Sequence, residues 1–148
     1  MSLRKRRHHQ PAASAGKIRS RDWLARNIAQ WQRQGERVVL TNGCFDLLHV
    51  GHVMLLERAR RQGDILIVAL NSDRSVRGLK GRARPIVPAR ERARLLAAFA
   101  SVDYVTIFDE ATPSKLIAVL KPDLLVKGAD WSMGRIRRGS SVKCAYHR

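Results

Sequence analysis

The sequence predicts an α/β fold in which a doubly wound, parallel β-sheet carries helices on both faces. Short runs that are apolar throughout alternate along the chain with stretches of helical periodicity. Continuously apolar strands are typical of parallel sheets that are buried on both faces, and a single helix between two strands supplies the right-handed crossover. The length of 148 residues and the apolar content of 45% suit one domain with one core.

The N-terminal part precedes this alternation. Residues 1–17 contain Pro, Ala, Ser, Gly and charge without any period, which predicts a basic, disordered tail. A leader helix is expected next, because Ser20 can cap it, Asp22 lies in its first turn and Gly35 can end it. Its apolar residues recur at helical spacing: Trp23, Leu24, Ile28 and Trp31. We expect this helix to pack through that face and to carry no chemistry.

The alternating pattern begins at residue 37. Strands are expected over residues 37–42, 64–71, 102–108 and 123–128. Helices are expected over residues 52–63, 88–100 and 112–120. Gly63 ends the first of these helices, Pro88 precedes the second, and Thr112 caps the third with Pro113 in its first turn. This order of elements indicates a Rossmann-like sheet.

The formal net charge of +17 is spread unevenly. Residues 1–37 carry 10 basic and 2 acidic residues, residues 38–126 carry 13 and 9, and residues 127–148 carry 6 and 1. The termini therefore make the protein basic. The N-terminal tail is expected either to bind polyanions weakly and without sequence preference, through counterion release, or to be a solvated segment.

Composition also excludes several classes of protein. There is no run of about 18 apolar residues, and no apolar stretch follows the basic N-terminus, so we expect no membrane span, no secretory signal and a cytoplasmic location. Cys44 and Cys144 lie far apart without Cys-x-x-Cys or Cys/His ligand spacing. This pattern argues against a disulfide framework and a zinc site.

Polar chemistry is concentrated in the stretch LTNGCFDLLHVGH, directly after the first expected strand. Ligands of open parallel sheets bind beyond the carboxyl ends of the strands, where a helix begins. Gly43 allows a tight turn, Gly51 removes bulk at the helix start, and helix N-terminal N–H groups attract phosphate. His49 and His52 can therefore face one anion and stabilise charge that grows on phosphorus. The alternatives are a helix cap or core role for each histidine, and a zinc site that lacks further ligands nearby.

This segment resembles the HxGH nucleotidyltransferase superfamily, which is cytidylyltransferase-like. The signature of that superfamily is a Gly-x-Phe-Asp turn followed by His-x-Gly-His, found here at residues 43–46 and 49–52. Over residues 18–131 the chain is similar to the heptose 1-phosphate adenylyltransferase domain of ADP-heptose synthesis. The similar stretches are VVLTNGCFDLLHVGHVMLLERAR, GDILIVALNSDRSVRGLKGRARPIVP and FDEATPSKLIAVLKPDLLVKGADW.

The resemblance implies transfer of an adenylyl group from ATP to D-glycero-β-D-manno-heptose 1-phosphate, giving ADP-heptose and pyrophosphate for the lipopolysaccharide inner core. Mg²⁺ is expected to accompany ATP and help to neutralise the triphosphate. Relatives of this kind are commonly dimers and some are fused to a sugar kinase. We therefore expect a homodimer and a separate sugar kinase in the same pathway.

The resemblance also implies roles for single residues. His49 and His52 would hold the triphosphate and stabilise the pentacoordinate phosphorus, and Lys80 would reach phosphate as a mobile cation from the loop after the second strand. The residues expected to bind the nucleotide are Asn42, Gly43, Cys44, Phe45, Asp46, Gly51, Asn71, Asp73, Arg92, Lys127 and Gly128. Asp130 is expected to bind sugar hydroxyls, with a metal or a turn cap as alternatives. A solvated lysine and a charged helix face are the alternatives for Lys80 and Arg92.

The sequence departs from the family after Asp130. Relatives continue to an Arg-Ser-Thr-Thr type segment that binds the triphosphate, and here only GSSV at residues 139–142 offers a weak match. We therefore expect an atypical segment over residues 132–148 and a fold that is truncated at its C-terminus. Two alternative functions stay open: a cytidylyltransferase acting on glycerol 3-phosphate or a similar phospho-alcohol, and a catalytically impaired remnant that binds nucleotides or polyanions.

Overall fold

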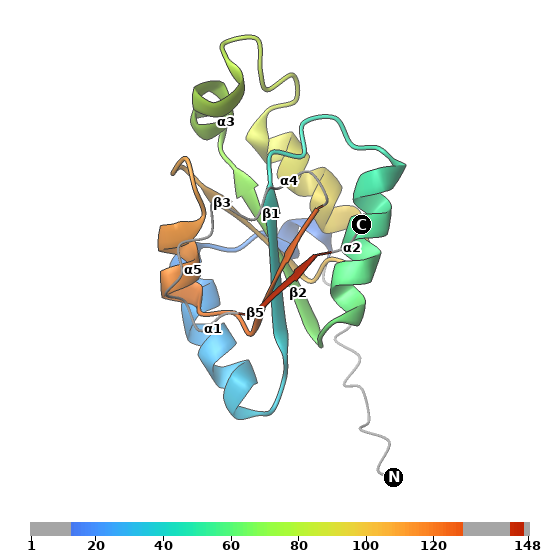
Figure 1. Ribbon diagram of the computed structural model, residues 1–148, viewed down its shortest axis with the longest axis vertical. Helices are drawn as coiled ribbons and strands as arrows, with labels where there is room; N and C mark the ends of the chain where they lie inside the picture. Colours follow the sequence, from blue (N-terminus) through green and yellow to red (C-terminus); the bar gives the residue numbers. More distant parts are fainter. Residues whose placement is uncertain (1–12, 129–142, 147–148) are drawn as a thin grey trace.

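A five-stranded parallel sheet with the strand order β3-β2-β1-β4-β5 lies at the centre of the molecule (Figure 1). The computed structural model describes residues 13–128 and the backbone of residues 143–146. The strands are β1 (Val38–Gly43), β2 (Ile65–Asn71), β3 (Tyr104–Phe108), β4 (Leu124–Lys127) and β5 (Lys143–Tyr146). The helices are η1 (Ser14–Lys17), α1 (Arg21–Arg33), α2 (Val50–Arg61), α3 (Asp73–Lys80), α4 (Ala89–Ala98) and α5 (Ser114–Leu120). The α/β, Rossmann-like fold class is confirmed.

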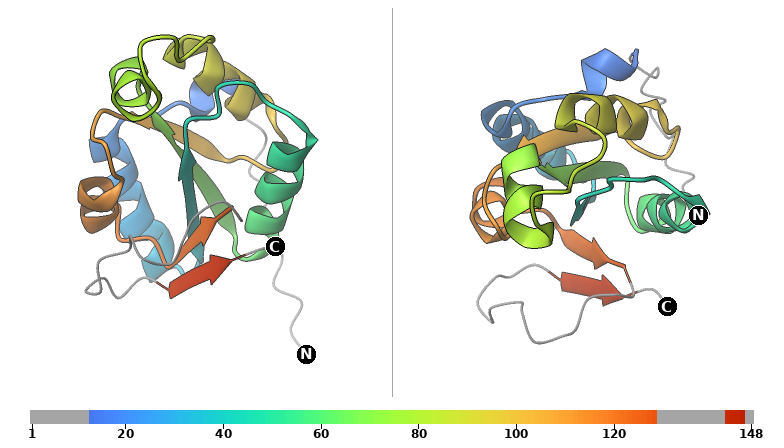
Figure 2. Two further views of the ribbon diagram at one scale, coloured as in Figure 1. Left: turned by 45° about the horizontal axis from the view of Figure 1, so that its top comes forward. Right: turned by 90° about the horizontal axis from the view of Figure 1, so that it is seen from above.

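Two helical layers cover the sheet. Helices α1 and α5 lie on one face, and α2 and α4 lie on the other, as the views in Figure 2 show. Side chains of β2 alternate between the two cores: Leu66, Val68 and Leu70 pack toward α2 and α4, whereas Ile67 and Ala69 pack toward α1 and α5. All seven residues of β2 are buried, which explains why this strand reads as one apolar run.

The strand order creates a topological switch point beside β1. The chain passes from β1 to β2 and β3 on one side, and then returns to β4 on the other side of β1. Thr41 of β1 is paired with Val126 of β4, so Asn42 and Lys127 follow at neighbouring positions of the same edge. Ligands of open α/β sheets bind at the carboxyl ends of the strands at such a point. A ligand site is therefore expected at the segments that follow β1 and β4.

Helix α3 was not expected from the sequence. Ser72 caps it by accepting a hydrogen bond from the backbone N–H of Ser75 at 3.1 Å, and Asp73 lies in its first turn. Most of its residues are polar, so periodicity alone indicated a loop. As a consequence Lys80 is the last residue of a helix, and its expected position in a loop was wrong.

The expected tail boundary at residue 17 was also wrong. Residues 14–17 form a 3-10 turn, and the buried Lys17 donates from Nζ to the carbonyl oxygens of Phe99 (3.2 Å) and Val102 (2.9 Å). An ammonium group is favourable there, because both carbonyls follow the C-terminus of α4. Ile18 then forms a parallel bridge with Val105 of β3. Residues 1–12 lie outside the described residues.

Two further sequence expectations concern helix ends. The expected Ser20 cap of α1 is confirmed, because its side chain accepts from the N–H of Trp23 at 3.2 Å. The expected Thr112 cap was wrong: α5 has Pro113 at its N-cap and no side-chain cap, and the Thr112 hydroxyl bonds to the Ser114 hydroxyl instead.

The C-terminal segment adds a strand that the sequence did not predict. The backbone of β5 pairs in parallel with β4, so the sheet extends beyond β4. Residues 129–142 and 147–148 lie outside the described residues, and these include Asp130 and the weak match at 139–142. None of the described helices combines the length and the apolar character that crossing a membrane requires.

Candidate functional site

The two histidines at the start of α2 form a reciprocal cap. His49 is the N-cap residue, and its Nδ1 accepts a hydrogen bond from the N–H of Gly51 at 3.1 Å. The Nδ1 of His52 accepts from the N–H of His49 at 3.2 Å, and the ring centroids lie 4.0 Å apart. Because each Nδ1 is an acceptor, the proton of each neutral ring lies on Nε2. Both imidazoles can therefore donate an Nε2–H to an anion at this helix N-terminus.

The two glycines of the motif make room for aromatic rings. A Cβ on Gly51 would lie 2.8 Å from Cε1 and 2.9 Å from Nδ1 of His49, so any side chain there would displace the ring. A Cβ on Gly43 would lie 3.0 Å from Cε2 of Phe45. The left-handed residue of this turn is Phe45 (φ 46°), and its buried ring lies 5.2 Å from that of His52. Gly43 thus admits the phenyl ring that supports His52.

Burial and neighbouring charge favour the neutral form of His52. Burial is the largest factor that lowers the pKa of His52 below its usual value, and the charges of His49 and Lys80 lower it further. A neutral ring retains the Nδ1 acceptor that the backbone N–H of His49 needs, and the lowered pKa extends this state to a more acidic pH than for a free histidine.

Lys80 lies near His52 and Cys44. Its side chain is exposed at the end of α3, and its charge lowers the pKa values of His52 and Cys44. Burial nevertheless raises the pKa of the free Cys44 thiol overall. Lys80 therefore adds an exposed positive charge near His52, and the raised pKa of Cys44 favours its thiol form.

Asp46 is a buried anchor for the segment that follows α3. One oxygen, Oδ2, accepts from Nη1 of Arg84 at 2.8 Å, and Oδ1 accepts from the backbone N–H groups of Ile86 (2.9 Å) and Val87 (3.0 Å). Burial raises the pKa of this carboxyl, but the bonds from Val87, Arg84 and Ile86 outweigh it and lower the pKa overall. Both oxygens are thus used within the protein, and the expected nucleotide contact of Asp46 is not what this geometry favours.

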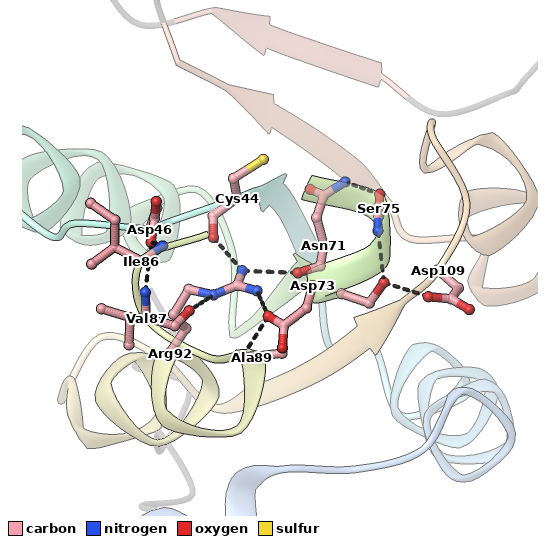
Figure 3. Close-up of polar contacts among 11 residues, drawn as sticks. Cys44, Asp46, Asn71, Asp73, Ser75, Ile86, Val87, Ala89, Arg92 and Asp109 are labelled. Atoms are coloured by element: carbon pink, nitrogen blue, oxygen red, sulfur yellow. Dashed lines mark hydrogen bonds and ion pairs between the residues drawn. The ribbon is translucent and has the colours of Figure 1, made fainter. Parts of the chain in front are cut away.

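Arg92 is a second buried anchor, and Figure 3 shows its fork of contacts. Its Nη1 donates to the carbonyl oxygens of Cys44 (2.6 Å) and Asn71 (2.9 Å). Its Nε donates to the carbonyl of Val87 at 2.8 Å, and its Nη2 donates to Oδ1 of Asp73 at 2.7 Å. The side chain is 0% exposed, and it joins the ends of β1 and β2. This differs from the expected nucleotide contact.

The remaining expected residues at β2 hold α3. The side chain of Asn71 donates to Oγ of Ser75 at 2.9 Å, and Ser75 donates to the carbonyl of Glu110 at 2.9 Å. Oδ1 of Asp73 also accepts from the N–H of Ala89, the first residue of α4. Ser72 donates to Oδ1 of Asp109. Asn71 and Asp73 therefore position α3 and α4 at the carboxyl edge.

The structure gathers most of the expected site residues at one edge of the sheet. Asn42 and Gly43 are the last residues of β1. The buried Lys127 is the last residue of β4, and Gly128 follows it in the chain. Asp130 lies outside the described residues. The sequence did not single out Arg84, whose partner Asp46 is 38 positions away, because a run of arginines gives no signal for one long-range pair.

The described residues do not form a metal site of their own. They include no group of three or more His, Cys, Asp or Glu side chains that could hold a metal ion. Asp46 uses both of its oxygens and Asp73 uses Oδ1 for protein donors, whereas both histidine rings have an Nε2–H left to donate and Lys80 adds an exposed ammonium group. These residues therefore do not fit a protein-held Mg²⁺, and they suit a polyanion.

The chain is similar to known proteins in both sequence and fold. A family model described as Cytidylyltransferase-like matches residues 40–140. The Bifunctional protein HldE of Koribacter versatilis is 59% identical over 133 residues, which cover 90% of this chain and 27% of that protein. The Bifunctional protein HldE of Methylobacillus flagellatus is 51% identical over 134 residues, which cover 90% and 28%. The chain thus spans about a quarter of the length of these relatives.

A solved structure also matches the fold. It is the lipopolysaccharide core biosynthesis protein from Thermoplasma volcanium GSS1, with a TM-score of 0.66 and 27% sequence identity. The match covers 75% of this chain and 95% of that one.

Proposed function

Because the chain belongs to the cytidylyltransferase-like family of nucleotidyltransferases, we propose that it transfers AMP from ATP to D-glycero-β-D-manno-heptose 1-phosphate, giving ADP-heptose and pyrophosphate. The observation that carries this proposal is the histidine pair, whose Nδ1 atoms are both engaged so that both Nε2–H groups are donors. The choice of acceptor is supported by the identity to two relatives named HldE and by the similarity to a lipopolysaccharide core biosynthesis protein of known structure.

In the proposed reaction a phosphate oxygen of the sugar phosphate attacks the α-phosphorus of ATP in line. The new P–O bond forms as the bond from the α-phosphorus to the bridging oxygen breaks, and pyrophosphate leaves with that electron pair. His49 and His52 donate their Nε2–H groups to phosphate oxygens and stabilise the charge that develops there. Lys80, at the end of α3, neutralises the departing phosphates. Mg²⁺ enters with ATP in this proposal and is not held by the described residues.

The proposed partners follow from the proposed reaction. A sugar kinase must supply the heptose 1-phosphate, and the protein works in the cytoplasm, where ATP is available. We also propose a homodimer, which light scattering of the purified protein tests directly.

The experiment is an incubation of the folded protein with ATP, Mg²⁺ and the heptose 1-phosphate. Pyrophosphate and ADP-heptose should form in equal amounts. A parallel reaction with CTP and glycerol 3-phosphate tests the cytidylyltransferase alternative. Product only in that second reaction would overturn the adenylyltransferase assignment, and product in neither reaction would favour the impaired nucleotide-binding alternative.

A further inference from the structure

Basic side chains are concentrated in one segment beside the site. Residues 74–94 carry eight basic residues and one acidic residue, whereas the rest of residues 38–126 carry five basic and eight acidic residues. Arg92 is buried, and the other seven form what we call the basic collar: Arg74, Arg77, Lys80, Arg82, Arg84, Arg90 and Arg94. Positive charge in this part of the chain is therefore local to α3, the following loop and the start of α4.

The collar retains most of its charge. Within the described part of the chain, Arg77, Lys80, Arg82 and Arg94 are exposed and make no ion pair. The carboxylates nearest to Arg74 and Arg90 lie 3.8 Å and 3.9 Å away, and both arginines are more than 80% exposed. Exposed pairs of this kind contribute about 0–1 kcal/mol, so they compensate the charge only weakly.

Two hydrogen bonds hold the collar at the carboxyl edge of the sheet. Arg84 bonds to Asp46 in the histidine loop, and Asp73 accepts from Ala89 at the start of α4. Lys80 is near enough to lower the pKa of His52. Figure 1 shows α3 and the segment after it standing beyond the end of β1. The unpaired charges therefore lie at the same edge of the sheet as the two histidines.

We propose that the basic collar is an electrostatic guide that draws the polyphosphate of the nucleotide toward the histidine pair and speeds its association. This inference rests on the proposed function, because it takes a nucleoside triphosphate as the ligand. A triphosphate is a compact mobile polyanion, and clefts bordered by one sign of charge raise association rates by roughly 10- to 1,000-fold. Residues 74–94 contain no Phe, Tyr or Trp on which bases could stack, which favours a small polyphosphate over single-stranded nucleic acid.

The test compares two variants of equal net charge. Arg77→Gln with Arg82→Gln removes two exposed charges from the collar and leaves Lys80, His49 and His52 intact. The control is Arg26→Gln with Arg33→Gln, which removes two exposed charges from α1, outside the collar. Stopped-flow fluorescence with a fluorescent, non-hydrolysable ATP analogue gives the association and dissociation rates at increasing ionic strength.

At about 20 mM salt the collar variant should associate roughly 3- to 10-fold more slowly than the wild type, with an unchanged dissociation rate, and the control should match the wild type. The difference should vanish near 0.5 M salt, where screening acts within a few ångströms. Equal association rates for both variants would overturn the proposal. A change confined to the dissociation rate would also overturn it, because that result indicates a direct ligand contact.

The same measurements separate this inference from the proposed function. One outcome is that association depends on salt and is slower in the collar variant, but no ADP-heptose forms. That result would support the electrostatic guide and reject the proposed reaction. Full ADP-heptose formation with identical association rates in the collar variant and the wild type would support the proposed reaction and reject the electrostatic guide. No binding of the analogue by the wild type would reject both.

Discussion

The geometry of single residues explains why the motif needs glycine between its histidines. The ring of His49 occupies the space that a side chain at Gly51 would need, and its Nδ1 bonds to the backbone of that same glycine. The glycine therefore fixes the orientation, and with it the donor atom, of a proposed catalytic side chain. Sequence reasoning found the glycine but explained it only by lack of bulk.

We predict that Gly51→Ala lowers kcat by about 100-fold, because a displacement of about 1 Å in a catalytic group can have that effect. The lost cap should also lower the free energy of unfolding by about 0.5–2 kcal/mol. The control is Gly78→Ala in α3, where a Cβ would meet nothing within 4 Å. That variant should be as active as the wild type and up to about 1 kcal/mol more stable in urea unfolding. Equal activity of both variants would contradict the account of His49.

Asp46 gives a pH-dependent prediction at the same scale. Its folded pKa is lowered, so its contribution to stability is complete above the unfolded value near 3.9 and is lost as the pH falls through the folded value. Asp46→Asn should lower the free energy of unfolding by about 1.5–3 kcal/mol at pH 7. Urea titrations from about pH 7 to about pH 2 should show a difference that is constant above the unfolded value and narrows below it. A constant difference across that range would show that the carboxylate charge is not what anchors Arg84.

At the scale of elements, the sequence predicted the buried strands and the longer helices well, because their apolar patterns are local. It missed α3, whose position depends on hydrogen bonds between Ser75 and Glu110 and between Ser72 and Asp109. It also missed the backbone pairing of β5 with β4. The cap at Ser72-Asp73 was a usable signal for α3, whereas its partners in the loop after β3 could not be identified from spacing.

Arg92 joins several elements through one side chain, and the sequence did not indicate this structural role. An arginine between Arg90 and Arg94 reads as part of a charged helix face, yet it is fully buried and bonds to the ends of β1 and β2. No pattern in the sequence shows which of these arginines points inward.

We predict that Arg92→Met lowers the free energy of unfolding by about 3–5 kcal/mol, because it leaves buried carbonyl groups and Asp73 without their partner. Arg92→Lys should cost less, since an ammonium group can replace part of the fork. Arg94→Met, two residues further along the same helix and exposed, should change stability by less than about 0.5 kcal/mol. Thermal and urea unfolding measure all three, and an Arg92→Met protein as stable as Arg94→Met would contradict the structural role.

At the scale of the whole molecule, the resemblance found in the sequence is confirmed by the family match and by the similarity to two HldE proteins. The edge of the sheet that carries the site was predictable, because a parallel order of strands dictates where ligands bind. The sequence did not show which residues at that edge stabilise the fold and which are available to a ligand. Asp46 and Arg92 anchor the frame, while His49, His52 and Lys80 present donors and charge outward.

The whole-molecule charge raises the question of whether nucleotide binding depends on the site or on the basic N-terminus. Residues 1–12 carry four basic and no acidic residues, and a basic segment of this kind binds polyanions only through counterion release. At 0.15 M salt the Debye length is about 8 Å, so such binding is largely screened. Deleting residues 1–12 should therefore change the dissociation constant for ATP by less than about twofold under these conditions.

His52→Ala should instead weaken ATP binding by about 10- to 100-fold, the range expected for losing a hydrogen bond to a charged group. The ring of His52 also packs on Phe45 and accepts from the backbone of His49, so circular dichroism must first show that the variant is folded. Calorimetric titration of ATP into both proteins compares the two effects directly. The opposite order, with binding lost on deletion and retained in His52→Ala, would identify the protein as a polyanion-binding remnant and would reject the histidine pair as its functional site.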